Sequence, residues 1–340
     1  MMQTAPVIDL LPARYALRPA TLDDAAAVTA LLNDCALAYS GEPAATVDEV
    51  RGAWQRPGLC LETDVAVVVA PDGRIVAQCT LFDEAPHVRL MAVADVHPEH
   101  MGRGLGTALC RWADARGRDA VNQAPPDARV VLAQNRLSTE EAAAALLLAQ
   151  GYAPVRYSFE MTIEFDGPPP EPVVPAGLAI RPFVRNREER AMVAALHDAF
   201  RDHWGNVERP LEDEHAELLH MLDNPMWDPA LLFVAVDGDE IAGTAFAQPV
   251  TAADPEMGWV AGLGVRRPWR RRGLAHALLQ RCFADLYRHG KRKVGLGVDA
   301  QSLTGATRLY ENAGMHVRRQ RCVYQKELRP GRELSTQSLT

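Results

Sequence analysis

Apolar runs and helical stripes follow one another along the chain in an order that occurs twice. In the first half, the apolar runs Val65–Ala70 and Ile75–Phe82 flank a turn that contains Asp-Gly. In the second half, Leu231–Val236 and Ile241–Gln248 flank another Asp-Gly turn. An Asp-Gly pair between two apolar runs is typical of a hairpin. Each half therefore contains a predicted pair of antiparallel strands.

The segments around these hairpins predict the same further elements in each half. A strand and a helix precede the hairpin, and a third strand, which ends at Val96 or Val265, follows it. A glycine-rich turn then leads into a helix, which in the second half carries an apolar stripe at helical spacing. Another strand, a helix and a last strand close each half. This order predicts an α/β (α+β) fold, a mixed sheet flanked by helices. The helices before the hairpins are expected at Asp23–Leu32 and Arg187–Phe200, and the strands after the glycine-rich turn and its helix at Val130–Ala133 and Val294–Val298. The apolar stripe consists of Leu278, Leu279, Cys282, Phe283 and Leu286.

Sequence matches at a nearly constant offset indicate an internal repeat. Leu17-Arg18-Pro19 recurs as Ile180-Arg181-Pro182, 163 residues later, and Val96–Gly104 resembles Val265–Gly273, 169 residues later. We therefore expect two copies of one domain, each of roughly 160 residues. The expected boundaries are a first domain at 1–166, a proline-rich linker at 167–177, a second domain at 178–330 and a flexible tail at 331–340.

Composition and charge narrow the classes of function. The chain has 340 residues, with 36 Lys and Arg against 44 Asp and Glu, and a formal net charge of −8. This balance argues against nucleic acid as a partner and favours a cationic or neutral small substrate. No stretch approaches the roughly 18 apolar residues of a membrane span. The start, Met1–Leu11, lacks the features of a signal peptide. We expect no membrane partner.

Cysteine and histidine usage predicts a cytoplasmic protein without a metal. The cysteines form no CxxC pair and lie in apolar segments, which is typical of reduced core thiols. The histidines include no HExxH, and His215 and His220 are five residues apart and do not share a helix face. The six cysteines are Cys35, Cys60, Cys79, Cys110, Cys282 and Cys322.

The strongest chemical signal is Arg270-Arg271-Arg272-Gly273-Leu274-Ala275, between a predicted strand and a predicted helix. Backbone N–H groups at a helix start lack intrahelical acceptors, and the helix dipole favours an anion there. Gly273 and Ala275 let a pyrophosphate approach the backbone, and the arginines add charge. The segment is neither a Walker loop nor a GxGxxG fingerprint. Taken alone, it fits an anion site or a solvated basic turn, and less well a nucleic-acid patch.

Two motifs in the same order resemble the GNAT superfamily of acyl-CoA-dependent N-acetyltransferases. The family pattern Arg/Gln-x-x-Gly-x-Gly/Ala, after a strand that ends in Val, is matched by Val265, Arg270, Gly273 and Ala275. The family signature of the last helix resembles Thr304–Met315, which contains Tyr310. The resemblance covers both repeats. It implies two tandem GNAT-like domains, each a mixed sheet. The sheet is expected to splay near the end of the strand that follows the hairpin, which in the second domain ends at Val265.

The resemblance also implies acetyl-CoA as co-substrate. The pantetheine arm would enter the splay, the pyrophosphate would lie on the turn after Val265, and Gly262 and Gly264 fit a bulge or a close backbone approach. Ser302 stands where Asn is common in the family. The implied binding residues are Leu263, Gly264, Val265, Arg270, Arg271, Arg272, Gly273, Leu274, Ala275, His276 and Ser302.

The implied reaction is direct attack of the primary amine of a small molecule on the thioester. The amine must lose a proton, and the leaving thiolate needs an acid. Tyr310 aligns with the family tyrosine that often serves as this acid, and a phenol has a pKa near ~10. The alternative role of Tyr310 is that of a core residue. The base is either ordered water or one of Asp202, His203, Asp254, Glu256 and Asp299.

The first copy departs from the family pattern. Met101 stands where Arg or Gln is expected before Gly102 and Gly104, and Leu147 stands at the position of Tyr310. The helix at Thr139–Gln150 is nearly all Ala, Leu and Glu. We expect that the N-terminal copy lost catalysis, and its binding of acyl-CoA is left open.

The tandem architecture is similar to that of the mycothiol synthases, in which the C-terminal copy is active. Trp259 stands where they have a substrate-binding acid. The substrate region is expected at Phe200–Gly205, Glu208–Leu222 and Met226–Trp227. Two other functions fit the sequence, a non-catalytic acyl-CoA-binding or sensing protein and a protein N-acetyltransferase. The chain is expected to be a monomer or a homodimer.

Overall fold

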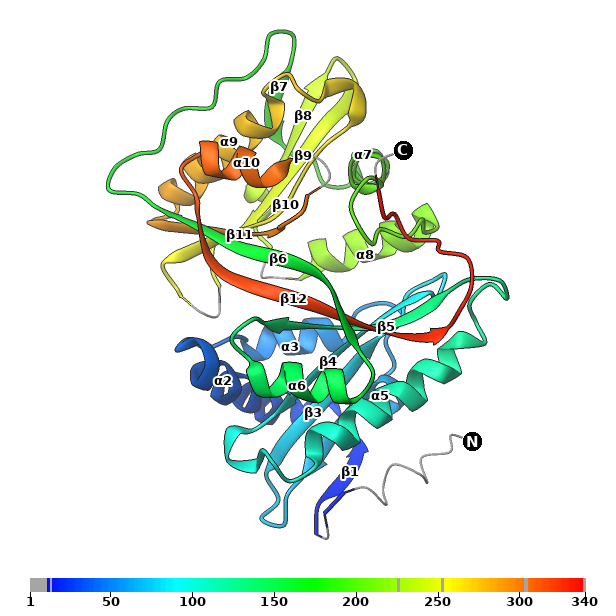
Figure 1. Cartoon of the computed structure of the whole chain (residues 1–340). Coiled ribbons are helices and arrows are strands. Elements are labelled where there is room, and N and C mark those ends of the chain that lie inside the picture. The colour runs from blue at the N-terminus through cyan, green and yellow to red at the C-terminus, as the bar shows by residue number, and fades with distance from the viewer. Residues whose placement is uncertain (1–10, 13, 225–226, 252–253, 303–304, 339–340) are drawn as a thin grey trace. The chain divides into compact units, whose positions relative to one another are not determined.

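The computed structural model describes residues 11–12, 14–224, 227–251, 254–302 and 305–338. They form two compact units (Figure 1). The first unit is Met1–Arg156 with Arg321–Leu334, and the second unit is Tyr157–Gln320 with Ser335–Thr340. Each is a mixed sheet with helices, as the sequence predicts. Met226 of the expected substrate region and Thr304 of the second motif lie outside the described residues.

The described residues of the first unit form five α-helices and six strands. Its strands are antiparallel to their neighbours except for the parallel pair β4 and β5. The helices are α2 (Ala25–Ser40), α3 (Val47–Trp54), α4 (Leu61–Asp64), α5 (Leu105–Val121) and α6 (Glu141–Ala149). The strands lie in the order β1 (Ala16–Pro19), β2 (Val65–Val69), β3 (Ile75–Phe82), β4 (Arg89–Val96), β5 (Val130–Leu137) and β12 (His316–Arg329).

The second unit repeats this plan. Its only parallel pair within the described strands is β10 with β11. The helices are α7 (Glu189–Phe200), α8 (Leu211–Asp223), α9 (Leu274–Arg288) and α10 (Ala306–Asn312). The strands lie in the order β6 (Ala153–Glu164), β11 (Lys293–Asp299), β10 (Met257–Val265), β9 (Glu240–Gln248), β8 (Leu232–Asp237) and β7 (Ala179–Pro182).

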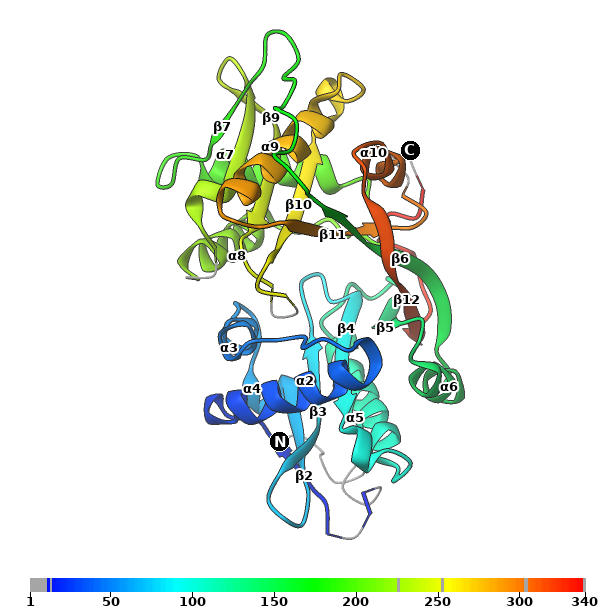
Figure 2. The same ribbon diagram turned by 90° about the vertical axis from the view of Figure 1, so that its left-hand side faces the viewer.

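Helices cover both faces of the sheet of the second unit (Figure 2). Alternate residues of β8 point to opposite faces, as strand geometry requires. Phe233 packs with the apolar stripe of α9, and Val234 packs with residues of α7 and α8. The stripe predicted from helical spacing is buried in full, with Cys282 completely inaccessible.

The strands β10 and β11 separate where the sequence predicts a splay. Their parallel pairing runs from Met257 with Lys293 to Val260 with Leu296, while β10 continues to Val265. The register of β10 against β9 shifts between Val260 and Gly262, which is the expected bulge. A Cβ atom at Gly262 would lie 2.0 Å from the Phe246 ring. The bulge therefore requires glycine at this position.

The last strand of each copy pairs outside its own copy. Residues Arg321–Arg329 of β12 pair with β5 in the first unit, and residues Ser158–Glu164 of β6 pair with β11 in the second unit. The compact units therefore differ from the contiguous ranges that we expected. The expected flexible tail also has fixed contacts. Arg332 forms a bridge with Ala128, and Ser335 forms one with Val207.

The cysteines are free, as expected, and all except the exposed Cys60 are buried. Across the described part of the chain, every helix is too short or too polar to cross a lipid bilayer.

Candidate functional site

The splay of the second unit opens into a cavity of about 440 Å³. Its walls come from the end of β10, the turn before α9, the end of α7 and the start of α10. The lining residues include most of the predicted cofactor-binding residues, namely Leu263, Gly264, Val265, Arg270, Arg271, Gly273, Leu274, Ala275 and His276. The structure thus brings the two sequence motifs together around one space.

The turn before α9 presents free backbone donors to this cavity. Gly273 is left-handed (φ 85°) at the start of the helix, and Arg271 is also left-handed (φ 59°). The first intrahelical bond runs from the Ala277 N–H to the Gly273 carbonyl. The N–H groups of Leu274, Ala275 and His276 therefore have no acceptor within the helix. Such a helix start fits a pyrophosphate.

Arg270 has a structural role that its motif did not predict. Its guanidinium donates to the Val265 carbonyl at 2.9 Å, to the Ala199 carbonyl at 3.1 Å and to Asp202 Oδ2 at 2.5 Å. Asp202 is buried and also accepts a hydrogen bond from Arg267 Nε at 2.9 Å. These contacts fasten the turn to the end of α7, and Arg270 also lines the cavity.

Hydrogen bonds from Arg267 and Arg270 hold the pKa of Asp202 far below its usual range. Asp202 is thus a fixed anion that balances the two arginines, and it is not a free proton acceptor. Of the other two arginines of the motif, Arg271 lines the cavity, and Arg272 is exposed and outside the lining.

The splayed edge of β10 offers its main chain to a ligand. Leu263 and Val265 pair with Ala245 and Gly243 of β9 on one side. On the other side, the pairing with β11 has already ended at Val260. Gly264 is packed against α7, where a Cβ atom would lie 2.8 Å from the Phe200 ring.

Ser302 lies outside the lining of this cavity. Its hydroxyl accepts a hydrogen bond from the Ala306 N–H at 3.2 Å at the start of α10.

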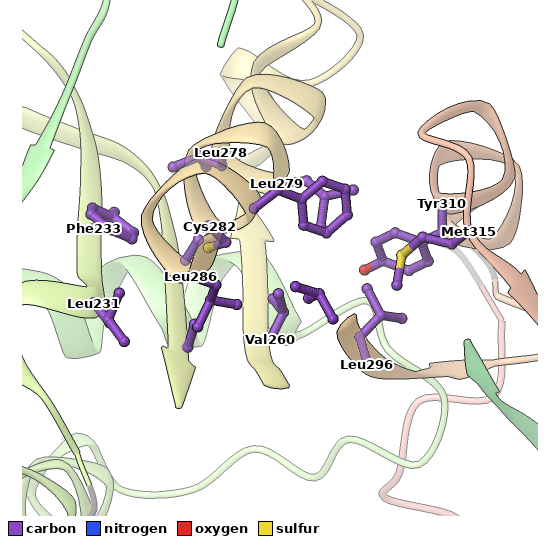
Figure 3. Packing of buried hydrophobic residues seen from close by; sticks show 14 of the residues in the cluster. Leu231, Phe233, Val260, Leu278, Leu279, Cys282, Leu286, Leu296, Tyr310 and Met315 are labelled. Carbon is purple, nitrogen blue, oxygen red and sulfur yellow. The ribbon is translucent and has the colours of Figure 1, made fainter. Parts of the chain in front are cut away.

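Tyr310 lies on α10 at the inner wall of the cavity. Figure 3 shows its ring next to Met315 and Leu296, at the edge of the core cluster. The side chain is 7% exposed. Burial, together with the nearby Cys282 thiol, raises the pKa of Tyr310 to about 12. The phenol therefore keeps its proton at neutral pH and is able to donate it.

His203 is the base candidate that the structure places in the cavity wall. Its ring meets the Phe200 ring edge-on, with centroids 4.6 Å apart, and the residue is exposed. The surrounding protein lowers the pKa of His203, and Arg270 lowers it further, against opposing effects of Asp299 and Asp202. The imidazole is therefore neutral near pH 7 and able to accept a proton.

The remaining base candidates do not line the cavity. Asp254 lies before the first residue of β10, where it contacts Lys293 at 3.3 Å, and Glu256 is an exposed neighbour. Asp299 ends β11 and accepts a hydrogen bond from the Gln301 N–H at 3.1 Å.

The expected substrate region forms a loop and the helix α8. Leu218 and Leu222 are buried, while Leu219 is exposed. The C-terminal tail holds the loop, because the Gly205 N–H donates to the Thr336 carbonyl at 2.7 Å and the Thr336 N–H donates to the Asn206 carbonyl at 2.8 Å. Sequence reasoning missed this contact, since a short polar tail carries no signal of its binding partner.

The first unit contains a related cavity of about 520 Å³. It is lined by residues of the matching turn, among them Met101, Gly102, Gly104 and Thr107, and by Leu147 on α6. Within the described residues, the one group of possible metal ligands with ligand atoms within 4.8 Å of one another is His97, Glu99 and His100, also in this unit. His100 Nδ1 is hydrogen-bonded to Tyr15, and His97 Nδ1 accepts from the Glu99 N–H.

Comparisons with known proteins place this geometry in context. The family model of the acetyltransferase (GNAT) family matches residues 193–315, which include both motifs of the second unit. A mycothiol acetyltransferase of Streptomyces scabiei is 30% identical over 251 residues, which cover 72% of this chain and 72% of the relative. A mycothiol acetyltransferase of Thermomonospora curvata is 34% identical and covers 64% of this chain and 68% of the relative.

Solved structures give the same result at the level of the fold. A GCN5-related N-acetyltransferase from Sphaerobacter thermophilus is 39% identical, with a TM-score of 0.78, over 96% of this chain and 100% of that one. A tandem GNAT protein from the clavulanic acid biosynthesis pathway is 18% identical, with a TM-score of 0.67, over 94% of this chain and 100% of that one. The second likeness concerns the fold alone.

Proposed function

The chain belongs to the GNAT family and is an N-acetyltransferase, and from this premise we propose that it moves an acetyl group from acetyl-CoA to the primary amine of a small molecule in the cavity of the second unit. The observation that carries this proposal is the meeting of the free helix start, the open edge of β10 and the Tyr310 phenol around one space. The acetyl thioester of acetyl-CoA supplies the group that is transferred.

The residues of this cavity fit such a co-substrate. The N–H groups of Leu274, Ala275 and His276 would hold the pyrophosphate, and the left-handed Gly273 keeps side chains out of its way. The main chain of Leu263 and Val265 would hold the pantetheine amides. Arg270 would act indirectly, since its contacts with Asp202 and Val265 fix the shape of the turn.

Two side chains of the cavity supply the proton transfers that the reaction needs. The C–N bond forms while the C–S bond breaks, the amine gives up a proton, and the thiolate takes one. We assign the first proton to the neutral imidazole of His203 and the second to the Tyr310 phenol. Exchange with the solvent of the cavity returns both groups to their starting states.

The choice of acceptor amine follows from the names of the relatives and from the residue at position 259. The relatives named mycothiol acetyltransferases favour a cysteinyl glucosaminyl-inositol amine as the first compound to try. Trp259 argues for a difference in acceptor, because those enzymes are expected to have an acid at its position. The Trp259 ring covers Gly295, at 2.7 Å from a Cβ atom built there.

The test is release of free thiol from acetyl-CoA in the presence of single amines. The panel contains the cysteinyl glucosaminyl-inositol precursor, polyamines, aminoglycosides and amino acids, and mass spectrometry identifies the acetylated product. Release with at least one amine supports the proposal. Tight binding of acetyl-CoA with no release from any amine favours the acyl-CoA-binding function, and acetylation of peptide N-termini alone favours the protein acetyltransferase.

A further inference from the structure

The two cavities can be compared position by position, because the two units repeat the same strands. Ala94 and Leu263 each lie two residues before the valine that ends the strand. The parallel ladders begin with the pairs Arg89–Val131 and Met257–Lys293. Arg136 lies five residues after Val131, and Val298 lies five residues after Lys293, so the two positions correspond. In the second unit, Val298 is a short apolar residue of the core.

In the first unit, Arg136 reaches across the splay. Its guanidinium donates to the Ala94 carbonyl, to Asp95 Oδ1 at 3.3 Å and to Gln134 Oε1 at 3.3 Å. Arg136 is 9% exposed. The Ala94 carbonyl matches the Leu263 carbonyl, one of the main-chain groups assigned above to the pantetheine arm. A side chain of the protein thus takes the place that a ligand amide would need.

The charges around Arg136 hold it there. Asp95 also accepts a hydrogen bond from Gln78 at 2.9 Å, and Glu140 Oε2 lies 3.6 Å from the Arg136 guanidinium. Glu140 is itself fixed, since it accepts from the Leu137 N–H at 2.9 Å. Displacing Arg136 would leave buried charges without partners, which is strongly unfavourable. The corresponding position to Asp95 in the second unit is Gly264, which has no side chain to hold such a network.

We infer that Arg136 and its acidic partners occupy the main-chain edge of the first cavity that the pantetheine arm would need, so that each chain binds a single acetyl-CoA, in the second unit. This inference rests on the proposed function of the second cavity. The first copy then serves as a folded partner for the exchanged strand β12 and contributes no second acyl-CoA site.

The chain offers a matched pair of variants for the test. Thr107 and His276 are the third residues of α5 and α9, and each lines its own cavity. An acidic residue in the first turn of a helix is compatible with the helix dipole, so both variants are expected to fold. It would repel a pyrophosphate bound at that turn.

Titration calorimetry of the full chain with acetyl-CoA should give one site per chain. His276→Glu should weaken binding at least tenfold, and Thr107→Glu should leave affinity and stoichiometry unchanged. Hydrogen exchange of the unaltered chain should show protection by acetyl-CoA at residues 262–276 and none at residues 94–107. Two sites per chain, or protection at 94–107, would overturn the inference. No binding at all would instead count against the proposed function.

Discussion

The buried carboxylate of Asp202 offers a sharp test of how the turn before α9, the proposed pyrophosphate site, is held. Asp202→Asn keeps the size of the side chain but removes the charge that balances Arg267 and Arg270. The side chain of Asp202 is 4% exposed, while those of Arg267 and Arg270 are 38% and 25% exposed. The change therefore leaves two arginines side by side, half screened by solvent.

The size of the effect follows from this exposure. Removing one partner of a fully buried ion pair costs about 3–5 kcal/mol. Solvent reaches both arginines and screens their repulsion. We therefore expect the free energy of unfolding to fall by about 2–3 kcal/mol, less than for a fully buried pair. A unit of this size loses about 2–4 °C of Tm for each kcal/mol. The transition of the second unit should therefore fall by about 4–12 °C.

The pH dependence gives the sign of this contribution. The pKa of Asp202 is lowered in the folded chain, so its contribution to the free energy of unfolding is present above the usual aspartate pKa. It is lost as the pH falls through the lowered value. The difference between the original chain and Asp202→Asn should persist at pH 5–7 and shrink in strong acid.

Scanning calorimetry measures the shift, and titration with acetyl-CoA measures the binding. The variant should bind acetyl-CoA about tenfold more weakly, which corresponds to about 1.4 kcal/mol, because the turn is no longer fastened to α7. Asp72→Asn is the control, since Asp72 pairs with Arg74 on an exposed turn at 2.8 Å and should change neither quantity. An Asp202→Asn variant with the original Tm and affinity would refute the role of the ion pair.

Three further results are expected. His203→Gln should lower kcat and remove the fall of the rate in acid, which should otherwise lie below the usual histidine pKa because the pKa of His203 is lowered; a retained acid limb would assign it to another group. A chain that ends at Leu334 should show a raised KM for the amine and faster hydrogen exchange at 203–207, since the bonds of Thr336 to this loop are lost; unchanged exchange would contradict the role of the tail. Gly264→Ala should lower the Tm, since the new methyl group would meet Phe200 at 2.8 Å; an unchanged Tm would show that Phe200 moves freely.

Local sequence predicted the elements and the glycine turn before α9 because their causes are local. The stripe from Leu278 to Leu286 is buried as helical spacing requires, and Gly273 is left-handed at the start of α9. The glycines of β10 mark a bulge and a close approach to Phe246. The resemblance of the two motifs to one family implies that Tyr310 and the turn lie at the same site, and both line one cavity.

The partners of residues far apart in the chain could not be predicted in this way. An alternating strand pattern does not say which strand lies next to it, so the exchange of β6 and β12 between the copies has no local signature. Arg270 carries the family motif, but its partner Asp202 is 68 residues away. The three arginines of the motif looked alike in sequence, and only their contacts separate the structural Arg270 from the exposed Arg272.

The most direct test of the central claim compares two buried tyrosines. Tyr310→Phe removes a hydroxyl from the cavity of the second unit, and Tyr152→Phe removes one from the core of the first unit, where it accepts from Gln134 at 3.4 Å. With an amine that supports thiol release, we expect Tyr310→Phe to lower kcat by about 10²–10⁴-fold, as for loss of a general acid, and Tyr152→Phe to keep the original kcat. Equal rates in the two variants, or loss of activity in Tyr152→Phe alone, would contradict transfer in the second unit.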